Sequence, residues 1–261
     1  PNQLVKTFNL NIVNYFIASL TGLFLYLFLI QLKFDPKLSL LGVFIFLGSR
    51  ISILSTGAPI VDSLYFLSII LIVYFCLTRK TIILTVLTPI LILTKETIVP
   101  FLFLPFFIKQ INRKLFGVSL LVSFILFFWV RNTISYWSSN IVESSDPIFY
   151  VLINHIKAGW GNITQTYFSV GGWHGIFSTY SIFWIFAAYG AWLSFKKLNT
   201  FYQIPHFLLF IIPITFGFTV LSSNVGRMLL GSFPIVIPYT LIGIDYLLFK
   251  KNTDHSNRPT S

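Results

Sequence analysis

The sequence is poor in charge and in reactive side chains. Its only cysteine is Cys76 and its only methionine is Met228, in 261 residues. A lone cysteine excludes an intrachain disulfide and a cysteine-based metal site. Only 10% of the residues are charged, against about 25% in soluble domains. Asp-x-Asp, His-Glu-x-x-His, P-loop and Gly-x-Gly-x-x-Gly motifs are all missing. We therefore expect no cofactor, and a divalent metal stays possible only without a recognisable ligand motif.

The chain is rich in apolar residues. Its residues are 56% hydrophobic, with 30 phenylalanines, and the mean hydropathy is +0.83. Uncharged runs approach the roughly 20 residues that a membrane crossing needs. We predict an all-α polytopic transmembrane bundle in one domain, residues 1–249, with an outer loop at 132–179 and a cytoplasmic tail at 250–261. About nine membrane segments are expected: Ile12–Leu32, Leu38–Gly48, Pro59–Leu77, Thr81–Thr94, Thr97–Ile108, Leu115–Val130, Tyr180–Phe195, Ile204–Leu221 and Met228–Phe249.

Two of these segments, Leu38–Gly48 and Thr97–Ile108, are short for a crossing. Either their polar ends continue the helix, or they are broken or re-entrant, which requires cover by protein or a water-filled cavity. Pro89, Pro100 and Pro105 predict kinks around the connection between 94 and 97.

Orientation follows from the distribution of lysine and arginine over alternate connections. Twelve are paired or clustered, as cytoplasmic anchors are: Lys33, Lys37, Arg79, Lys80, Lys109, Arg113, Lys114, Lys196, Lys197, Lys250, Lys251 and Arg258. Six are scattered singly: Lys6, Arg50, Lys95, Arg131, Lys157 and Arg227. The basic residues thus indicate topology rather than nucleic-acid binding. The C-terminus is expected in the cytoplasm, and the location is expected to be a bacterial cytoplasmic membrane.

The single charges on the predicted outer side are the candidate site. Arg50, Lys95 and Arg227 are suited to bind a phosphate, because arginine and lysine donate charge-assisted hydrogen bonds to phosphate oxygens. Three carboxylates are candidates for a catalytic base: Asp62, Glu96 and Asp146. We expect Lys95 to bind the phosphate. Glu96 is then expected to hold Lys95 or a neighbouring arginine in place. The alternative is that these charges only extend from helix ends to water.

The outer loop is rich in aromatic residues. Trp160 and Trp173 are expected to contact a sugar or a lipid, to anchor the loop at the membrane interface, or to do both. Gly159-Trp160-Gly161 and Gly171 to Gly175 are expected to form turns.

A family resemblance rests on four short motifs. In order they are Thr56 to Leu64, then Arg79-Lys80, then Thr94-Lys95-Glu96-Thr97, and a late run from Asn224 to Pro234 with an arginine before an apolar stretch. This order resembles the middle of GT-C superfamily membrane glycosyltransferases. The resemblance implies a polyprenyl-phosphate-linked sugar donor, an exoplasmic site and a catalytic acid in a first outer loop. The acidic residue of that loop is the general base in the family, and the loop and its preceding helix are expected to lie upstream of this sequence.

The sequence therefore predicts a membrane glycosyltransferase that transfers a sugar from a lipid-phosphate-linked donor, with membrane lipids and that donor as its partners. Two alternatives stay open. A transporter or flippase of lipid-linked glycans would use the same charges along a translocation path. A non-catalytic membrane protein would carry them incidentally.

Overall fold

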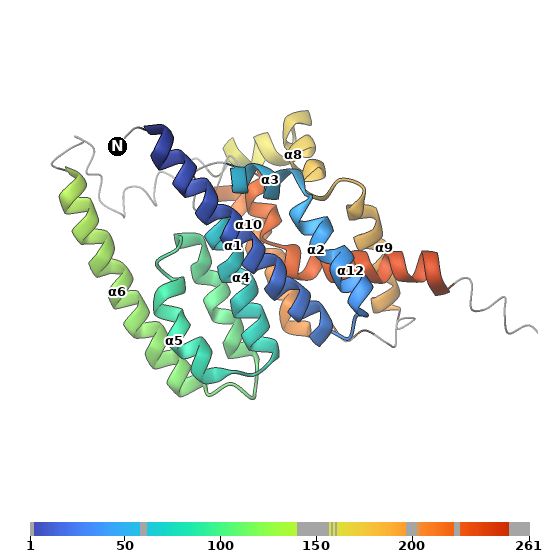
Figure 1. Ribbon diagram of the computed structural model, residues 1–261, viewed down its shortest axis with the longest axis horizontal. Coiled ribbons are helices and arrows are strands. Elements are labelled where there is room, and N and C mark those ends of the chain that lie inside the picture. Colours follow the sequence, from blue (N-terminus) through green and yellow to red (C-terminus); the bar gives the residue numbers. More distant parts are fainter. Residues whose placement is uncertain are drawn as a thin grey trace, which may run out of the picture.

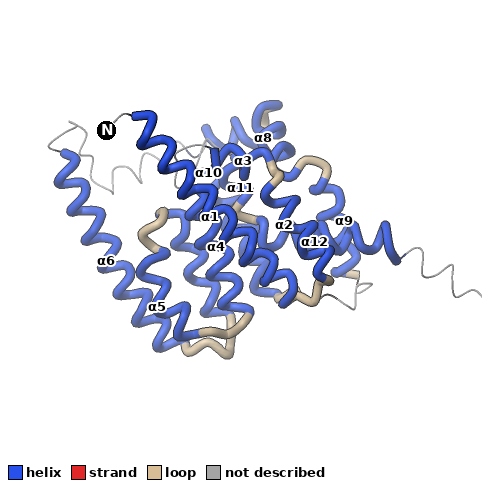
Figure 2. The backbone as a smooth tube through the Cα atoms, viewed as in Figure 1, coloured by secondary structure: helices blue, strands red, loops and turns tan. Residues whose placement is uncertain are grey.

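A computed structural model of the chain describes residues 3–57, 62–139, 157, 159, 161–196, 202, 204–221 and 225–250. These ranges are mostly helical and contain no β-strand, in agreement with the predicted all-α class. The first half contains α1 (Gln3–Gln31), α2 (Pro36–Leu47), α3 (Arg50–Gly57), α4 (Asp62–Leu77), α5 (Thr81–Leu91), η1 (Glu96–Phe107) and α6 (Arg113–Ser139). The second half contains α8 (Val170–Tyr180), α9 (Phe183–Phe195), η2 (His206–Phe210), α10 (Ile211–Leu221), α11 (Val225–Leu230), α12 (Phe233–Asp245) and η3 (Tyr246–Lys250). Short connections join most of these helices (Figures 1 and 2).

All nine predicted segments contain helix, but few of the helices have the length of a membrane span. By length and composition, two described helices qualify alone, Leu10–Gln31 of α1 and Arg113–Thr133 of α6. The bent pairs α2–α3 and α8–α9 raise the number to four if each pair counts as one span. The remaining apolar helices are shorter than a perpendicular crossing requires. Nine membrane segments therefore stay a prediction, while an all-helical bundle with candidate spans is what the structure contains.

The outer face of α6 suits a lipid environment. Val118, Leu121, Ile125 and Trp129 are 63–65% exposed and follow one another at helical spacing along it. A water-soluble monomer rarely presents such a continuous apolar surface. On its inner side, α6 packs against α5, where the Ser119 hydroxyl donates to the Thr85 carbonyl.

The short segment at Leu38–Gly48 continues into a second helix at an angle. Helix α2 ends where the Gly48 N–H donates to the Phe44 carbonyl at 2.8 Å. Ser49 then caps α3, because its hydroxyl accepts a hydrogen bond from the Ser52 N–H at 3.2 Å. The two helix axes differ by 62°. Arg50 is the first residue after this bend.

The proline-rich segment after Lys95 forms a 3₁₀ helix of 12 residues, far longer than the three or four residues usual for this helix type. Pro100 and Pro105 lie inside it, and each removes a backbone donor and crowds the carbonyl four residues earlier. The kinks predicted here take the form of a break. Helix α5 ends at Leu91, and Lys95 has extended backbone angles before η1 begins.

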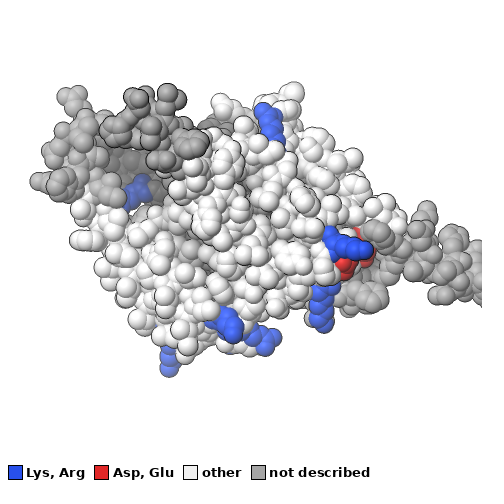
Figure 3. All heavy atoms as spheres, in the orientation of Figure 1, with Lys and Arg blue, Asp and Glu red and all other residues white. Residues whose placement is uncertain are grey.

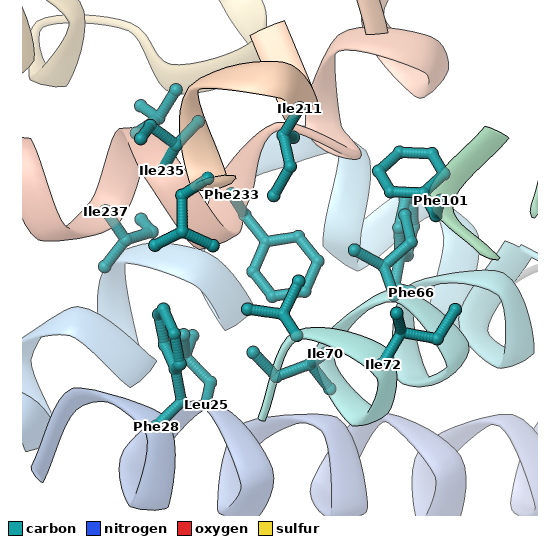
Figure 4. Packing of buried hydrophobic residues seen from close by; sticks show 14 of the residues in the cluster. Leu25, Phe28, Phe66, Ile70, Ile72, Phe101, Ile211, Phe233, Ile235 and Ile237 are labelled. Atoms are coloured by element: carbon teal, nitrogen blue, oxygen red, sulfur yellow. The ribbon is translucent and has the colours of Figure 1, made fainter. Parts of the chain in front are cut away.

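Buried side chains of α1, α2, α4 and α12 belong to one hydrophobic core, part of which Figure 4 shows. The Phe233 ring at the start of α12 stacks at a tilt on Phe46 of α2, with centroids 4.5 Å apart. It also meets Phe66 of α4 edge-on at 6.4 Å. Leu25 and Phe28 of α1 complete this cluster and are fully buried. Packing of α2 on α12, together with the contact between Phe66 and Phe233, places early and late parts of the chain side by side.

The connections that carry paired basic residues lie on one side of the bundle. They join α1 to α2, α4 to α5, and η1 to α6, and they occupy the lower half of Figure 1. Lysine and arginine spheres gather along the lower edge of the same face in Figure 3. Helices α3 and α8 lie at the opposite side. This separation is consistent with the predicted orientation, which stays a prediction.

Candidate functional site

Asp62 is the centre of the candidate site. It is the first residue of α4, and its side chain is 1% exposed. One carboxylate oxygen accepts a hydrogen bond from Lys95 Nζ at 2.9 Å, and the other accepts one from Arg227 Nε. A buried carboxylate needs such partners, because loss of water strongly disfavours an unpaired charge. We call Asp62, Lys95 and Arg227 the ion triad.

Three separate parts of the chain contribute to the ion triad. Lys95 lies between α5 and η1, where the extended backbone lets its side chain reach the start of α4. Its ammonium group also lies 5.3 Å from the centre of the Tyr65 ring, which adds a cation–π contact. Arg227 comes from α11, 165 residues beyond Asp62. The triad thus joins α4, the start of η1 and α11.

The ion triad carries one net positive charge and is partly accessible. The Lys95 side chain is 17% exposed and that of Arg227 is 32% exposed, whereas Asp62 is almost fully covered. A partly exposed cationic pair held by a buried carboxylate is suited to stabilise an anion that approaches from outside. Asp62 itself has both oxygens engaged with cations. A carboxylate in that state is a poor proton acceptor, so the geometry favours a positioning role for Asp62.

Arg50 is not one of the two cations paired with Asp62, and it lines two neighbouring pockets. The first has a volume of about 630 Å³ and runs between the α2–α3 bend and the α8–α9 bend. The second has a volume of about 530 Å³ and is bordered by α3, residues 162–166, the start of α8, and Val225 and Gly226. Val225 and Gly226 immediately precede Arg227, so the second pocket reaches the backbone beside the ion triad.

Some predicted site residues fall outside the described part of the chain. These are Asp146, Trp160 and the side chain of Glu96. The role of holding Lys95, which the sequence assigned to Glu96 as an expectation, is filled in the structure by Asp62. Glu96 and Asp146 remain candidates for a catalytic base.

Trp173 lies on α8 but lines neither pocket. Its side chain is 59% exposed, and its indole N–H donates to the Tyr167 carbonyl at 3.0 Å. The adjacent glycines, expected as a turn, instead belong to the first turns of α8, which Ser169 caps by accepting from the Gly172 N–H. The turn prediction at 171–175 is wrong because a side chain at Gly172 would collide with the backbone of Gln165 and Thr166, so glycine here permits close packing rather than a turn.

Apart from Arg50, sequence reasoning did not select the residues that line the second pocket. They include neutral polar side chains such as Gln165, Thr166, Ser169 and His174. Their only sequence signal was a weakly charged, polar-aromatic stretch between two apolar segments. Within the described residues, no group of three His, Cys, Asp or Glu side chains is placed to hold a metal ion.

No protein-family model, curated protein or solved structure matches this chain. The resemblance to GT-C glycosyltransferases therefore rests on the short sequence motifs alone.

Proposed function

We propose that this chain is a multi-pass membrane glycosyltransferase of GT-C type, which transfers a sugar from a lipid-phosphate-linked donor to an acceptor. It would act on the exoplasmic side of a bacterial cytoplasmic membrane, with about nine membrane segments and a cytoplasmic C-terminus. The observation that carries the proposal is the ion triad, a net-positive cluster of one buried carboxylate and two cations from distant segments, next to a polar pocket.

The chemistry gives each member of the triad a role. When the bond between sugar and lipid phosphate breaks, negative charge remains on the departing phosphate. Lys95 and Arg227 would stabilise that charge. Asp62 would position both cations before the donor arrives, so that no reorganisation is needed during the reaction. Glu96 or Asp146 would accept the proton of the acceptor.

The proposal is tested by release of lipid phosphate. The purified protein is reconstituted in vesicles with polyprenyl-phosphate-linked glucose, mannose or arabinose, and membrane extract of the source cells supplies acceptors. We expect release of polyprenyl phosphate from one of these donors. Lys95→Met should lower the release at least 100-fold, since a point charge in the transition state is lost. Glu96→Gln should retain measurable release.

The matched control is Lys80→Met, which removes a lysine from the connection between α4 and α5 on the opposite side of the bundle. It should transfer sugar as the unaltered protein does. Release from none of the donors, or full activity of Lys95→Met, would contradict the proposal. Movement of the donor's sugar headgroup across the vesicle membrane, without cleavage of its bond to the lipid phosphate, would instead identify a flippase.

A further inference from the structure

The two pockets differ in chemistry and meet at shared residues. Arg50, Leu54 and Ser178 line both of them. The first pocket is bordered largely by hydrocarbon, from Leu41, Phe44, Ile45, Ile53 and Phe183. The second is bordered mainly by neutral polar groups, from Asn162, Gln165, Thr166, Ser169 and His174. The pair therefore forms one continuous surface that is apolar at one end and polar at the other.

Arg50 provides the charge at the junction. Its side chain is exposed, and no carboxylate of the described residues lies within ion-pair distance of it. The guanidinium group presents a fork of donors that matches a phosphate, and it is always charged. An arginine at the boundary of an apolar and a polar pocket suits a ligand whose own phosphate separates a hydrocarbon chain from a polar group.

The apolar pocket opens outward rather than into the core. Phe44, Ile53 and Leu54 are 64%, 59% and 55% exposed, although each borders the pocket. Both helix breaks, at Gly48-Ser49 and at Ser181, line it as well. Broken helices at membrane depth occur where their backbone is covered by protein or lines a cavity. An apolar opening of this kind favours a hydrocarbon chain over a free anion.

From these features we infer that the two pockets form one binding site for a lipid phosphate. The hydrocarbon chain occupies the pocket between the α2–α3 and α8–α9 bends, the phosphate binds Arg50, and the polar headgroup lies in the pocket beside α8 and α11. The headgroup end thereby points toward the backbone before Arg227. The inference rests on the proposed function and extends it to the donor before reaction. Arg50 binds the phosphate of the resting donor, and Lys95 and Arg227 take that phosphate over from Arg50 when its bond to the sugar breaks.

Binding is measured without turnover. The protein is placed in phosphatidylcholine nanodiscs, and binding of radiolabelled geranylgeranyl phosphate is followed against two competitors, geranylgeraniol and inorganic phosphate. We expect saturable binding of the lipid phosphate. Both competitors should be at least tenfold weaker than unlabelled geranylgeranyl phosphate, because each supplies only part of the ligand.

Two pairs of variants locate the site. Arg50→Gln should weaken binding of the lipid phosphate at least tenfold, as expected for loss of a charge-assisted contact, and leave the alcohol unaffected. Arg131→Gln, which removes another arginine of the predicted outer side, should bind as the unaltered protein does. Ser178→Phe should block the junction between the pockets, whereas Ser178→Ala should not.

Several outcomes would overturn the inference. These are equal binding of the phosphate and the alcohol, competition by inorganic phosphate as strong as that by the lipid phosphate, or unchanged binding by Arg50→Gln. Size-exclusion chromatography confirms that each variant is folded, and Arg50→Gln decides the matter if Ser178→Phe aggregates. Sugar transfer without Arg50-dependent binding would contradict this inference alone. Arg50-dependent binding without transfer would contradict only the proposed glycosyltransferase.

Discussion

The Asp62 side chain is almost fully shielded from water and is paired with two cations. The Lys95 ammonium lies 2.9 Å from one carboxylate oxygen, and the Arg227 guanidinium binds the other. Replacing a buried ion cluster by apolar groups is often neutral, but removing one member leaves the others uncompensated. The single anion is therefore the member whose loss is most costly, since two cations depend on it.

We predict that Asp62→Asn lowers the free energy of unfolding by about 3 kcal/mol. Lys95→Met should cost less, about 2 kcal/mol, because Arg227 still neutralises the carboxylate. Unfolding of the purified protein in detergent, followed by circular dichroism against temperature, measures both. The double variant should be less destabilised than the sum of the two single variants, because they share one interaction. Additive losses would show that the two groups act independently.

Single residues of the site were predictable, but their arrangement was not. Asp62, Lys95 and Arg227 can be selected from the sequence, because a single charge beside an apolar run carries a free-energy cost in a membrane and is usually functional. Their pairing spans 33 and 165 residues, and no local pattern encodes a contact across that distance. Arg50 was grouped with Lys95 and Arg227 for the same reason, yet it lines separate pockets.

Close helix crossing determines the arrangement of α9 and α12. Gly190 and Gly243 face each other there, and a side-chain carbon on Gly190 would lie 2.8 Å from the Gly243 nitrogen and closer still to the Tyr239 carbonyl. Small residues at helix interfaces in membranes permit this approach, since packing rather than the hydrophobic effect drives association. The crossing also orients α8, which is joined to α9 at a 72° bend.

Gly190→Ala or Gly243→Ala should therefore force the two helices apart and destabilise the protein by about 1–3 kcal/mol. Gly217→Ala on α10 is the control, because a side-chain carbon there meets no atom within 4 Å. That variant should be neutral or slightly stabilising, as alanine restricts the unfolded chain. Thermal unfolding midpoints of the three variants test the difference. Equal stability of Gly190→Ala and Gly217→Ala would contradict tight packing at the crossing.

Apolar runs in the sequence predicted where most helices lie, but not where the helices bend or break. Hydrophobicity identified the segment at Leu38–Gly48, while the following helix α3 has an interrupted apolar pattern and was not predicted. The irregular backbone around Lys95 was signalled by Pro89, Pro100 and Pro105, because proline has a definite local effect. The bend between α8 and α9 falls at Ser181, which has a positive φ of 49°, and a serine gives little sequence signal for that conformation.

Across the whole molecule, the two sides of the bundle differ in charge. Clustered lysines and arginines border the connections in the lower half of Figure 1, while Arg50 and the helices α3 and α8 lie opposite. The positive-inside rule assigns the clustered side to the cytoplasm. With that assignment we expect Arg50 and helices α3 and α8 on the exoplasmic side.

Cysteine labelling in intact cells tests this orientation. With Cys76 replaced by alanine, Gly161→Cys should react with a membrane-impermeant thiol reagent, because residue 161 is exposed beside α8. Gln110→Cys, in the exposed connection between η1 and α6, should react only after permeabilisation. The opposite pattern of labelling would place the ion triad and Arg50 on the cytoplasmic side and contradict an exoplasmic reaction.

The sequence distance between Asp62 and its partners also sets an order of events during synthesis. At 5–20 residues per second, Arg227 leaves the ribosome roughly 8–33 seconds after Asp62, whereas Lys95 follows within roughly 2–7 seconds. For most of this interval Lys95 is the only one of the two cations available. A nascent chain without Lys95 would carry a bare carboxylate at the head of an apolar helix until α11 was made. We therefore expect Asp62 to pair with Lys95 first and with Arg227 only after α11 has been made.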